Sequence, residues 1–147
     1  MKKPQQATAE DVLDLSVAVI EFYFRIDAIS AALAGFANAG GEWGTLRTLV
    51  NDGPQTVPDM ARSKPVSRQH CQTIVNALEA QGLVEFIDNP KHKTSKLVRV
   101  TKKGQARFQS MRKQFLAAAG NYAPLFTSAE VAVATDVCRR ARDMIEV

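Results

Sequence analysis

Apolar residues recur at helical spacing along the first quarter of the chain. The segment from Ala9 to about Phe36 contains no proline, and Thr8 followed by two acids offers a hydroxyl cap for a helix start. Two apolar stripes run along this predicted helix, one with Leu15, Val19, Phe22, Ile26, Ile29 and Leu33 and the other with Leu13, Val17, Ile20, Phe24 and Ala28. Such wide apolar surface implies burial on most sides of the helix. A chain this short has little to cover it, so the pattern predicts an obligate homodimer.

Three shorter helices are predicted in the middle of the chain. The first has apolar residues at helical spacing before the turn cluster 51–54: Trp43, Leu46, Leu49 and Val50. Thr56 can cap the next helix, which runs to about Ser63. Ser67 can cap a third that ends at Gln81-Gly82, where glycine favours a left-handed C-cap. Two helices joined by a tight turn are typical of a helix-turn-helix.

The helix that begins after Ser67 has two different faces. Its apolar residues follow the spacing i, i+3, i+4, i+7 and are predicted to lie in the core: Cys71, Ile74, Val75 and Leu78. The opposite face gathers amides and hydroxyls, flanked by basic residues: Gln69, Gln72, Thr73 and Asn76, with Arg68 and His70. Amide side chains can read adenine edges, and Arg can read guanine. We expect this face to read bases in the major groove, and a plain solvated face is the alternative.

Two β-rich runs, 83–87 and 96–100, predict a β-hairpin with a basic tip. Lys91, His92 and Lys93 lie at that tip, and such a ribbon beside a reading helix suits phosphates or the minor groove. Helix-turn-helix followed by a basic hairpin is a winged helix. Thr101 then caps a helix to about Asn121, and a capping box at 127–130 opens a last one. The apolar face of that last helix, which we expect to pair with the first helix in the dimer, consists of Val131, Ala134, Val137 or Cys138, Ala141 and Ile145.

The composition is typical of one globular domain, and the charge distribution favours binding to a polyanion. The 147 residues are 46% hydrophobic and 23% charged, and the net charge is +4. The excess is concentrated between Arg62 and Lys113, where 12 basic residues face 3 acidic ones, while the flanking segments together carry −5. The middle of the chain therefore attracts polyanions such as nucleic acid.

The same composition excludes several classes of protein. No run of apolar residues is long enough to span a membrane, and the polar N-terminus is unlike a signal peptide, so we expect a cytoplasmic protein that binds no membrane. Two distant cysteines and two histidines predict neither a metal site nor a disulfide framework. Without paired carboxylates, a phosphate loop or a nucleophile beside a base, we expect no enzyme and no cofactor.

Five stretches of the chain combine into one pattern: Trp43 with Leu46 to Leu49, Thr56 to Ala61, Val66 to Gln69, Leu78 to Val84, and Asn89-Pro90 through Thr101 with Gly104. This pattern resembles the MarR family of winged-helix transcriptional regulators. The resemblance implies a mainly α, α+β fold with a small β-hairpin wing. It also implies a dimeric repressor or activator that binds double-stranded DNA at a pseudo-palindromic operator. Many such relatives are released by small, often aromatic ligands or by cysteine oxidation.

The resemblance divides the single domain 1–147 into a winged helix-turn-helix at 41–104 and a helical dimerisation region at 8–38 and 105–147. The expected DNA-binding residues are Ser67, Arg68, Gln69, His70, Gln72, Thr73, Lys91, Lys93 and Lys96, with Lys102 and Lys103 as additions. A small aromatic or anionic effector could bind between the two regions, at Phe22, Arg25, Ile26, Trp43 and Met111, although plain core packing is the other interpretation of these five. A winged-helix adaptor that binds only proteins is the alternative function.

The chain departs from the family pattern at three places. Many relatives have an acid followed by two arginines in the wing, where this chain has His92-Lys93-Thr94. Lys lacks the planar fork of Arg, so phosphate contact can replace insertion into the minor groove. Thr73 stands where the recognition helix of relatives often has a basic residue. The first helix also lacks the cysteine of redox-sensing relatives, and we expect Cys71 and Cys138 to be structural.

Overall fold

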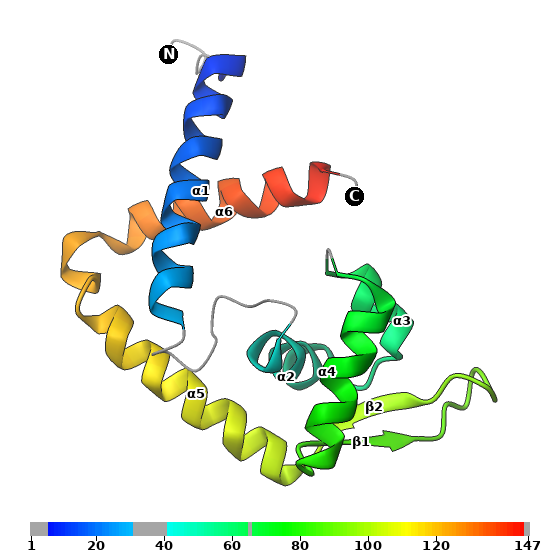
Figure 1. Ribbon diagram of the computed structural model, residues 1–147. Coiled ribbons are helices and arrows are strands. Elements are labelled where there is room, and N and C mark those ends of the chain that lie inside the picture. The colour runs from blue at the N-terminus through cyan, green and yellow to red at the C-terminus, as the bar shows by residue number, and fades with distance from the viewer. Residues whose placement is uncertain (1–5, 31–40, 65, 146–147) are drawn as a thin grey trace.

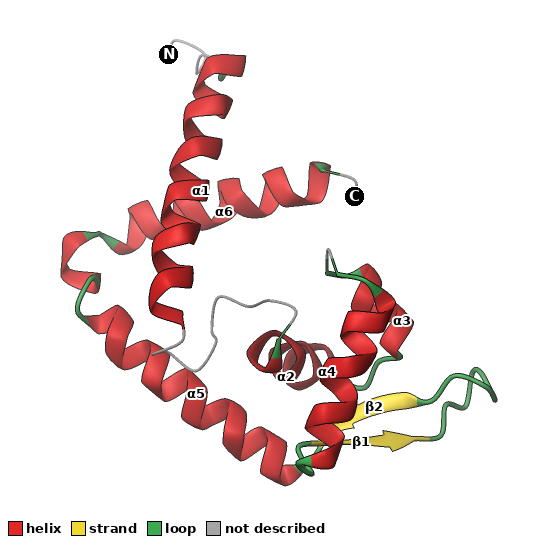
Figure 2. Cartoon of the chain, in the orientation of Figure 1, coloured by secondary structure: helices red, strands yellow, loops and turns green. Residues whose placement is uncertain are grey.

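The computed structural model describes residues 6–30, 41–64 and 66–145. Within them the chain is mostly helical with a single β-hairpin, which confirms the predicted α+β class (Figures 1 and 2). The elements in chain order are α1 (Ala9–Ser30), α2 (Glu42–Asp52), α3 (Val57–Arg62), α4 (Arg68–Ala80), β1 (Val84–Ile87), β2 (Leu97–Val100), α5 (Lys102–Gly120), η1 (Ala123–Leu125) and α6 (Ser128–Met144). The predicted continuation of the first helix to residue 36 lies outside the described residues.

Short polar side chains begin the helices where the sequence predicts them. At each of five helix starts a hydroxyl accepts a hydrogen bond from the backbone N–H three residues later: Thr8, Thr56, Ser67, Thr101 and Thr127. Glu130 completes the predicted capping box by accepting from the backbone N–H of Thr127 at 2.7 Å. Each cap satisfies backbone donors that the first helical turn leaves without a partner, and so fixes the residue at which the helix begins.

Gly82 ends α4 and sets the direction of the chain into the sheet. Its φ of +70° is left-handed, a conformation that glycine adopts without strain. The Leu83 N–H donates to the Leu78 carbonyl at 2.9 Å and the Gly82 N–H donates to the Glu79 carbonyl at 2.8 Å, which is a Schellman motif. β1 follows at once, so this glycine fixes the position of the hairpin relative to α4.

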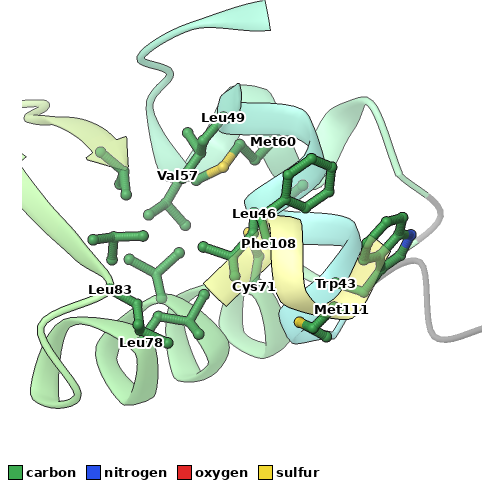
Figure 3. Packing of buried hydrophobic residues seen from close by; sticks show 14 residues of the cluster. Trp43, Leu46, Leu49, Val57, Met60, Cys71, Leu78, Leu83, Phe108 and Met111 are labelled. Carbon is green, nitrogen blue, oxygen red and sulfur yellow. The ribbon is translucent and has the colours of Figure 1, made fainter. Parts of the chain in front are cut away.

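The hydrophobic core lies wholly within residues 43–111 of the described chain (Figure 3). Leu46 of α2, Met60 of α3 and Val75 of α4 are completely buried at its centre. Trp43 stacks on Phe108 of α5, with ring centroids 4.7 Å apart. Cys71, Val75 and Leu78 are buried as predicted, whereas Ile74 is only half-buried at the edge of the core. The core therefore fixes which face of α4 remains in solvent.

The hairpin is joined to the helices at both ends. β1 and β2 are antiparallel, with Val84 opposite Val100. Gln55, in the connection between α2 and α3, forms an additional bridge with Val98 through two backbone hydrogen bonds of 2.8 and 3.2 Å. The Thr101 hydroxyl donates to the Gly82 carbonyl at 2.7 Å, which joins the start of α5 to the end of α4. These bonds hold the hairpin in a fixed position beside α4.

α1 and α6 lie at the end of the molecule away from the hairpin, and α5 connects the two parts (Figure 1). No side chain of α1 or α6 among the described residues is buried. The described members of both predicted stripes are exposed apart from half-buried Ile26, with Phe24 64% and Phe22 67% exposed, while Ile29 and Leu33 lie outside the described side chains. No helix in the described ranges combines the length and apolar character needed to cross a bilayer.

Candidate nucleic-acid interface

The amide and hydroxyl face of α4 lies in solvent, as the core packing of the opposite face requires. Most of the residues predicted to meet DNA from this helix and its cap are exposed, and one is half-buried: Ser67, Arg68, Gln69, His70 and Thr73, with Gln72 the half-buried one. The Ser67 hydroxyl accepts from the His70 N–H at 3.1 Å and so orders the first turn. α4 therefore presents an ordered polar surface beside α3.

Two side-chain hydrogen bonds organise the middle of this polar face. Gln72 Nε2 donates to Asn76 Oδ1 at 2.7 Å, and Thr73 Oγ1 donates to the Gln69 backbone carbonyl at 3.0 Å. Asn76 was not among the expected DNA-binding residues, although its place four residues after Gln72 is the spacing at which helical side chains meet. This i, i+4 spacing is the sequence signal for the pair. The structure adds that Gln72 is the donor and Asn76 the acceptor.

The connection between β1 and β2 carries the basic residues of the wing. Lys91, Lys93 and Lys96 are exposed. Asn89 orders the loop, because its side-chain oxygen accepts from the Lys91 N–H at 3.0 Å and its carbonyl accepts from the His92 N–H at 3.2 Å. The hairpin projects past α3 and α4, at the end of the molecule opposite α1 (Figure 1). The wing therefore projects from the winged-helix part of the chain, which also contains α4 (Figure 1).

Five of the twelve basic residues between Arg62 and Lys113 have partners inside the chain. Three arginines form ion pairs, namely Arg62 with Asp59, Arg99 with Glu85 and Arg107 with Glu42. Two lysines donate to backbone carbonyls, Lys64 to that of Gly44 at 3.1 Å and Lys103 to that of Gln81 at 2.7 Å. Lys103, considered from sequence as a phosphate contact, thus helps to cap the C-terminus of α4, where a cation is stabilising.

The other seven have no ion pair or side-chain hydrogen bond with any described residue: Arg68, Lys91, Lys93, Lys96, Lys102, Arg112 and Lys113. Four of these lie on the first turn of α4 or on the wing. The positive charge that remains for an external anion is thus concentrated beside the polar face of α4. This is the electrostatic pattern of a nucleic-acid interface.

α3 contributes an acid to the edge of this surface. Asp59 accepts from the Thr56 hydroxyl at 2.7 Å and from Arg62 at 3.1 Å. The Thr56 hydrogen bond lowers the pKa of Asp59, and the charge of Arg62 and a smaller effect of His92 lower it further. Asp59 therefore remains ionised, and it neutralises Arg62 at the margin of the basic surface.

Comparison with known proteins identifies the family to which this arrangement of helices and β-hairpin belongs. A family model described as MarR family matches residues 35–93, which span α2, α3, α4 and the wing as far as Lys93. An uncharacterized protein of Mycobacterium tuberculosis is 32% identical over 116 residues, covering 79% of each chain. The chain belongs to the MarR family of winged-helix regulators.

Solved structures support the MarR fold over nearly the whole chain. The transcriptional regulator BldR from Sulfolobus solfataricus superposes with a TM-score of 0.74 at 17% identity, covering 93% of this chain and 99% of BldR. A MarR family transcription regulator named SP03579 superposes with a TM-score of 0.69 at 22% identity, covering 94% of each chain. The likeness includes the α1, α5 and α6 helices, which the family model match leaves out.

The five candidate effector residues of this MarR chain are not brought together. Trp43 and Met111 are buried in the core, as the packing interpretation holds. Phe22 and Arg25 line a shallow open hollow of about 500 Å³ on α1, and Ile26, a half-buried residue, does not line it. Because Trp43 and Met111 belong to the winged-helix core, α1 and the core do not combine into the expected pocket.

A larger open cavity of about 1080 Å³ lies elsewhere in this MarR chain, between α1, α6 and the connection from α3 to α4. Apolar residues of α1, among them Leu15 and Val19, face the basic residues Arg62, Lys64 and Arg142 across it. Sequence periodicity could not indicate this cavity, because its walls come from three segments that are distant in the chain.

The two cysteines differ in environment. Cys71 is 2% exposed, and burial raises the pKa of its thiol, although the nearby charge of Lys64 acts in the opposite direction. Burial also lowers the pKa of Lys64. Cys138 lies exposed on α6 in the single chain and lines the larger cavity, so the described residues give it no place in a packed interior. The structural role expected from sequence is supported for Cys71 alone.

We expect Cys71 to resist alkylation for as long as the protein is folded. Burial keeps the thiol protonated and out of reach of reagents, and the thiolate is the reactive form. In a Cys138→Ser variant at pH 8, iodoacetamide should modify Cys71 at least tenfold more slowly in buffer than in urea, as measured by intact mass. Equal rates in the two solutions would show that Cys71 is accessible in the native state.

Proposed function

We propose that this protein is a sequence-specific transcriptional regulator that binds duplex DNA, with α4 in the major groove and the wing on the flanking backbone or minor groove. The observation that carries the proposal is an exposed amide and hydroxyl face on α4, which has no acid before Glu79, together with four cations on α4 and the wing that have no ion pair or side-chain hydrogen bond with a described residue. Membership of a family of transcription regulators agrees with it. A helix with hydrogen-bonding side chains reads base edges, and cations around it bind phosphates.

The residues divide between reading bases and holding the backbone. We assign the base edges to side chains that project from the first two turns of α4: Arg68, Gln69, His70, Gln72 and Thr73. We assign the phosphates to the helix cap and the wing: Ser67, Lys91, Lys93 and Lys96. Lysine binds a phosphate as a point charge and needs no fixed geometry, which suits a loop.

The operator that fits this assignment is an inverted repeat. A homodimer related by a two-fold axis would place its two α4 helices in successive major grooves, about 34 to 36 Å apart. The exposed apolar surface of α1 and α6 supports such a dimer, because monomeric proteins rarely leave so many large apolar side chains together in water. Tyr122, Leu125 and Phe126, between α5 and α6, extend the same exposed surface.

We expect a double substitution on one stripe of α1, Ile20→Glu with Phe24→Glu, to convert the dimer into a monomer. Both side chains are more than half exposed in the single chain and lie four residues apart on one face. Burying two large apolar side chains on each of two protomers contributes about 6 kcal/mol or more, or roughly 10⁴-fold in Kd. Sedimentation velocity at micromolar concentration measures the change.

The control for this variant is Glu10→Lys, a charge change in the exposed first turn of α1. It should leave the sedimentation coefficient of the wild type unchanged. A wild-type protein that sediments as a monomer would contradict the proposed dimer. A double variant that stays dimeric would move the interface to another face.

A small-molecule effector is a further part of the proposal. The PcaV regulator from Streptomyces coelicolor was solved in complex with its natural ligand, and the DNA binding of BpsR from Bordetella bronchiseptica is regulated by 6-hydroxynicotinic acid. In this chain the cavity between α1, α6 and the α3–α4 connection combines apolar walls with Arg62, Lys64 and Arg142, and an apolar anion would compete with Asp59 and Asp143 for the two arginines. Aromatic acids such as 6-hydroxynicotinate can be tested for reciprocal effects on thermal stability and DNA affinity.

The experiment that tests the function is selection of bound duplexes from a random 30-base-pair pool by the full-length protein, followed by affinity measurements against salt. Enrichment of an inverted repeat with a steep salt slope supports the proposal. Weak binding without enrichment or salt dependence would contradict it and favour the alternative, a winged-helix adaptor that binds only proteins. The +9 charge of the middle segment is the feature that disfavours that alternative.

A further inference from the structure

The polar face of α4 contains a side-chain arrangement that limits which bases it can recognise. Gln72 Nε2 donates to Asn76 Oδ1 at 2.7 Å, and the neighbouring Thr73 Oγ1 donates to the Gln69 carbonyl at 3.0 Å. Thr73 and Asn76 are exposed and Gln72 is half-buried. Both hydrogen bonds form within the helix, before any DNA is present, and each uses a donor that could otherwise meet a base.

We propose that Gln72 and Thr73 select A·T base pairs in the major groove, with Asn76 as a positioning residue for the Gln72 amide. This inference rests on the proposed function, because it concerns what α4 reads once it lies in the groove. It adds a base class to the proposal and gives Asn76, which lies on the predicted reading face but has no assigned DNA contact, a positioning role.

The Gln72 amide keeps one donor and one acceptor for a base. One of its two amide hydrogens is bound to Asn76, which leaves the other hydrogen and the Oε1 atom. Adenine presents an acceptor at N7 next to a donor at N6, so this pair of groups is complementary to it. Guanine presents two acceptors, N7 and O6, and would set Oε1 against O6. The amide therefore favours adenine over guanine.

Asn76 reduces the entropy that Gln72 loses on binding. A free glutamine side chain has several rotamers, and ordering it at an interface costs conformational entropy. The Asn76 carbonyl holds the amide on the exposed face before DNA arrives. Asn76 thus acts through Gln72 and needs no contact of its own with a base.

Thr73 keeps its methyl group and the acceptor lone pairs of its hydroxyl oxygen, and of these only the methyl can recognise thymine. Its hydroxyl proton is used on the Gln69 carbonyl, so it has no proton to donate to a base acceptor. A threonine methyl packs well against the C5-methyl of thymine. Gln72 and Thr73 both belong to the polar face of α4, about 100° apart around the helix, so one can meet an adenine through N6 and N7 and the other a thymine through its methyl.

The first test uses modified bases in the selected operator with the full-length protein. Within the half-site segment that α4 protects, one adenine is replaced by 7-deazaadenine, which lacks N7, and one thymine by uracil, which lacks the methyl. Each replacement should weaken wild-type binding about tenfold at one position of the half-site. In Gln72→Ala the 7-deazaadenine effect should disappear, and the uracil effect should remain.

A matched pair of variants separates the two groups of Thr73. Thr73→Val keeps a methyl and removes the hydroxyl, whereas Thr73→Ser keeps the hydroxyl and removes the methyl. We expect Thr73→Val to retain the preference of thymine over uracil and Thr73→Ser to lose it. The reverse result would show that the hydroxyl contacts the base and would overturn this part of the inference.

A double-mutant cycle tests the positioning role of Asn76. Asn76→Ala should reduce the 7-deazaadenine effect in the wild-type background and change nothing in the Gln72→Ala background. The control is Gln81→Ala, which removes another amide of the α4 region that is bound to the Ala77 carbonyl at 3.1 Å, and it should leave base discrimination intact. Additive effects of Gln72→Ala and Asn76→Ala would overturn the positioning role.

The outcomes distinguish this inference from the proposed function. A selection without enriched sequences contradicts the function itself. An enriched inverted repeat whose α4-protected segment contains no A·T pair, or one in which neither modified base weakens binding, leaves the function in place and overturns the A·T assignment. We expect each variant to remain folded, because the substituted side chains are exposed or, in the case of Gln72, half-buried, and thermal unfolding of each variant checks this.

Discussion

Replacing Gly104 by alanine should lower the free energy of unfolding of the winged helix by about 3 kcal/mol or more. A Cβ atom at this position would lie 1.9 Å from the Leu83 carbonyl oxygen and 2.8 Å from Val100 Cγ2. The Leu83 carbonyl cannot move easily, because it also accepts a hydrogen bond from the backbone N–H of Thr101 at 3.0 Å. Relieving the overlap therefore requires α5 to move away from the start of the sheet.

Gly120→Ala in the same helix is the matched control for that substitution. Nothing lies within 4 Å of a Cβ atom at Gly120, and alanine is the better helix former by up to about 1 kcal/mol, so this variant should be as stable as the wild type or more so. Urea unfolding followed by circular dichroism measures both variants. A Gly104→Ala protein with wild-type stability would mean that α5 is not held against the Leu83 carbonyl in solution.

Replacing the two lysines at the tip of the wing, Lys91→Ala with Lys93→Ala, should weaken operator binding about 10² to 10³-fold at 0.15 M salt. Both ammonium groups lack a partner among the described residues, so the substitution breaks no contact within the chain. A dimer has two wings, so four phosphate contacts would be lost, and the slope of log affinity against log salt should fall by roughly 3 to 4 units.

Arg112→Ala with Lys113→Ala removes the same number of charges from α5, outside both α4 and the wing. This control should change affinity only a few-fold through the general field of the protein. Fluorescence anisotropy with the selected operator, repeated at several salt concentrations, compares the two variants. Equal losses in both would contradict the wing as a phosphate-binding loop and would attribute the binding to net charge alone.

Local sequence signals located most of the described secondary structure, although not the short 3-10 helix η1. Thr56, Ser67 and Thr127 each mark the helix start seen in the structure, because a capping hydroxyl needs only the N–H three residues ahead. Gly82 marks the end of α4 for an equally local reason, its left-handed φ. The amphipathic spacing of α4 also indicated which of its faces is buried, with Ile74 less buried than its place in the pattern indicated.

The candidate effector site shows where local signals fail. Phe22 and Arg25 lie on an exposed helix face, whereas Trp43 and Met111 pack into a core that α1 does not enter. Helical spacing shows which apolar side chains share one face of a helix. It does not show which other element that face packs against. The larger cavity, lined by α1, α6 and the α3–α4 connection, depends on the packing of segments distant in the chain.

The basic residues mark the same division. The sequence by itself determined that the middle of the chain is strongly positive and that a polar helix face and a basic hairpin lie within it. Only the tertiary structure decided that Arg99, Arg107 and Lys103 are used for internal contacts while Arg68 and the wing lysines remain available. Charge along a chain is additive, but its availability to DNA depends on which carboxylates and carbonyls the fold brings within a few ångströms, and that is a property of three-dimensional packing alone.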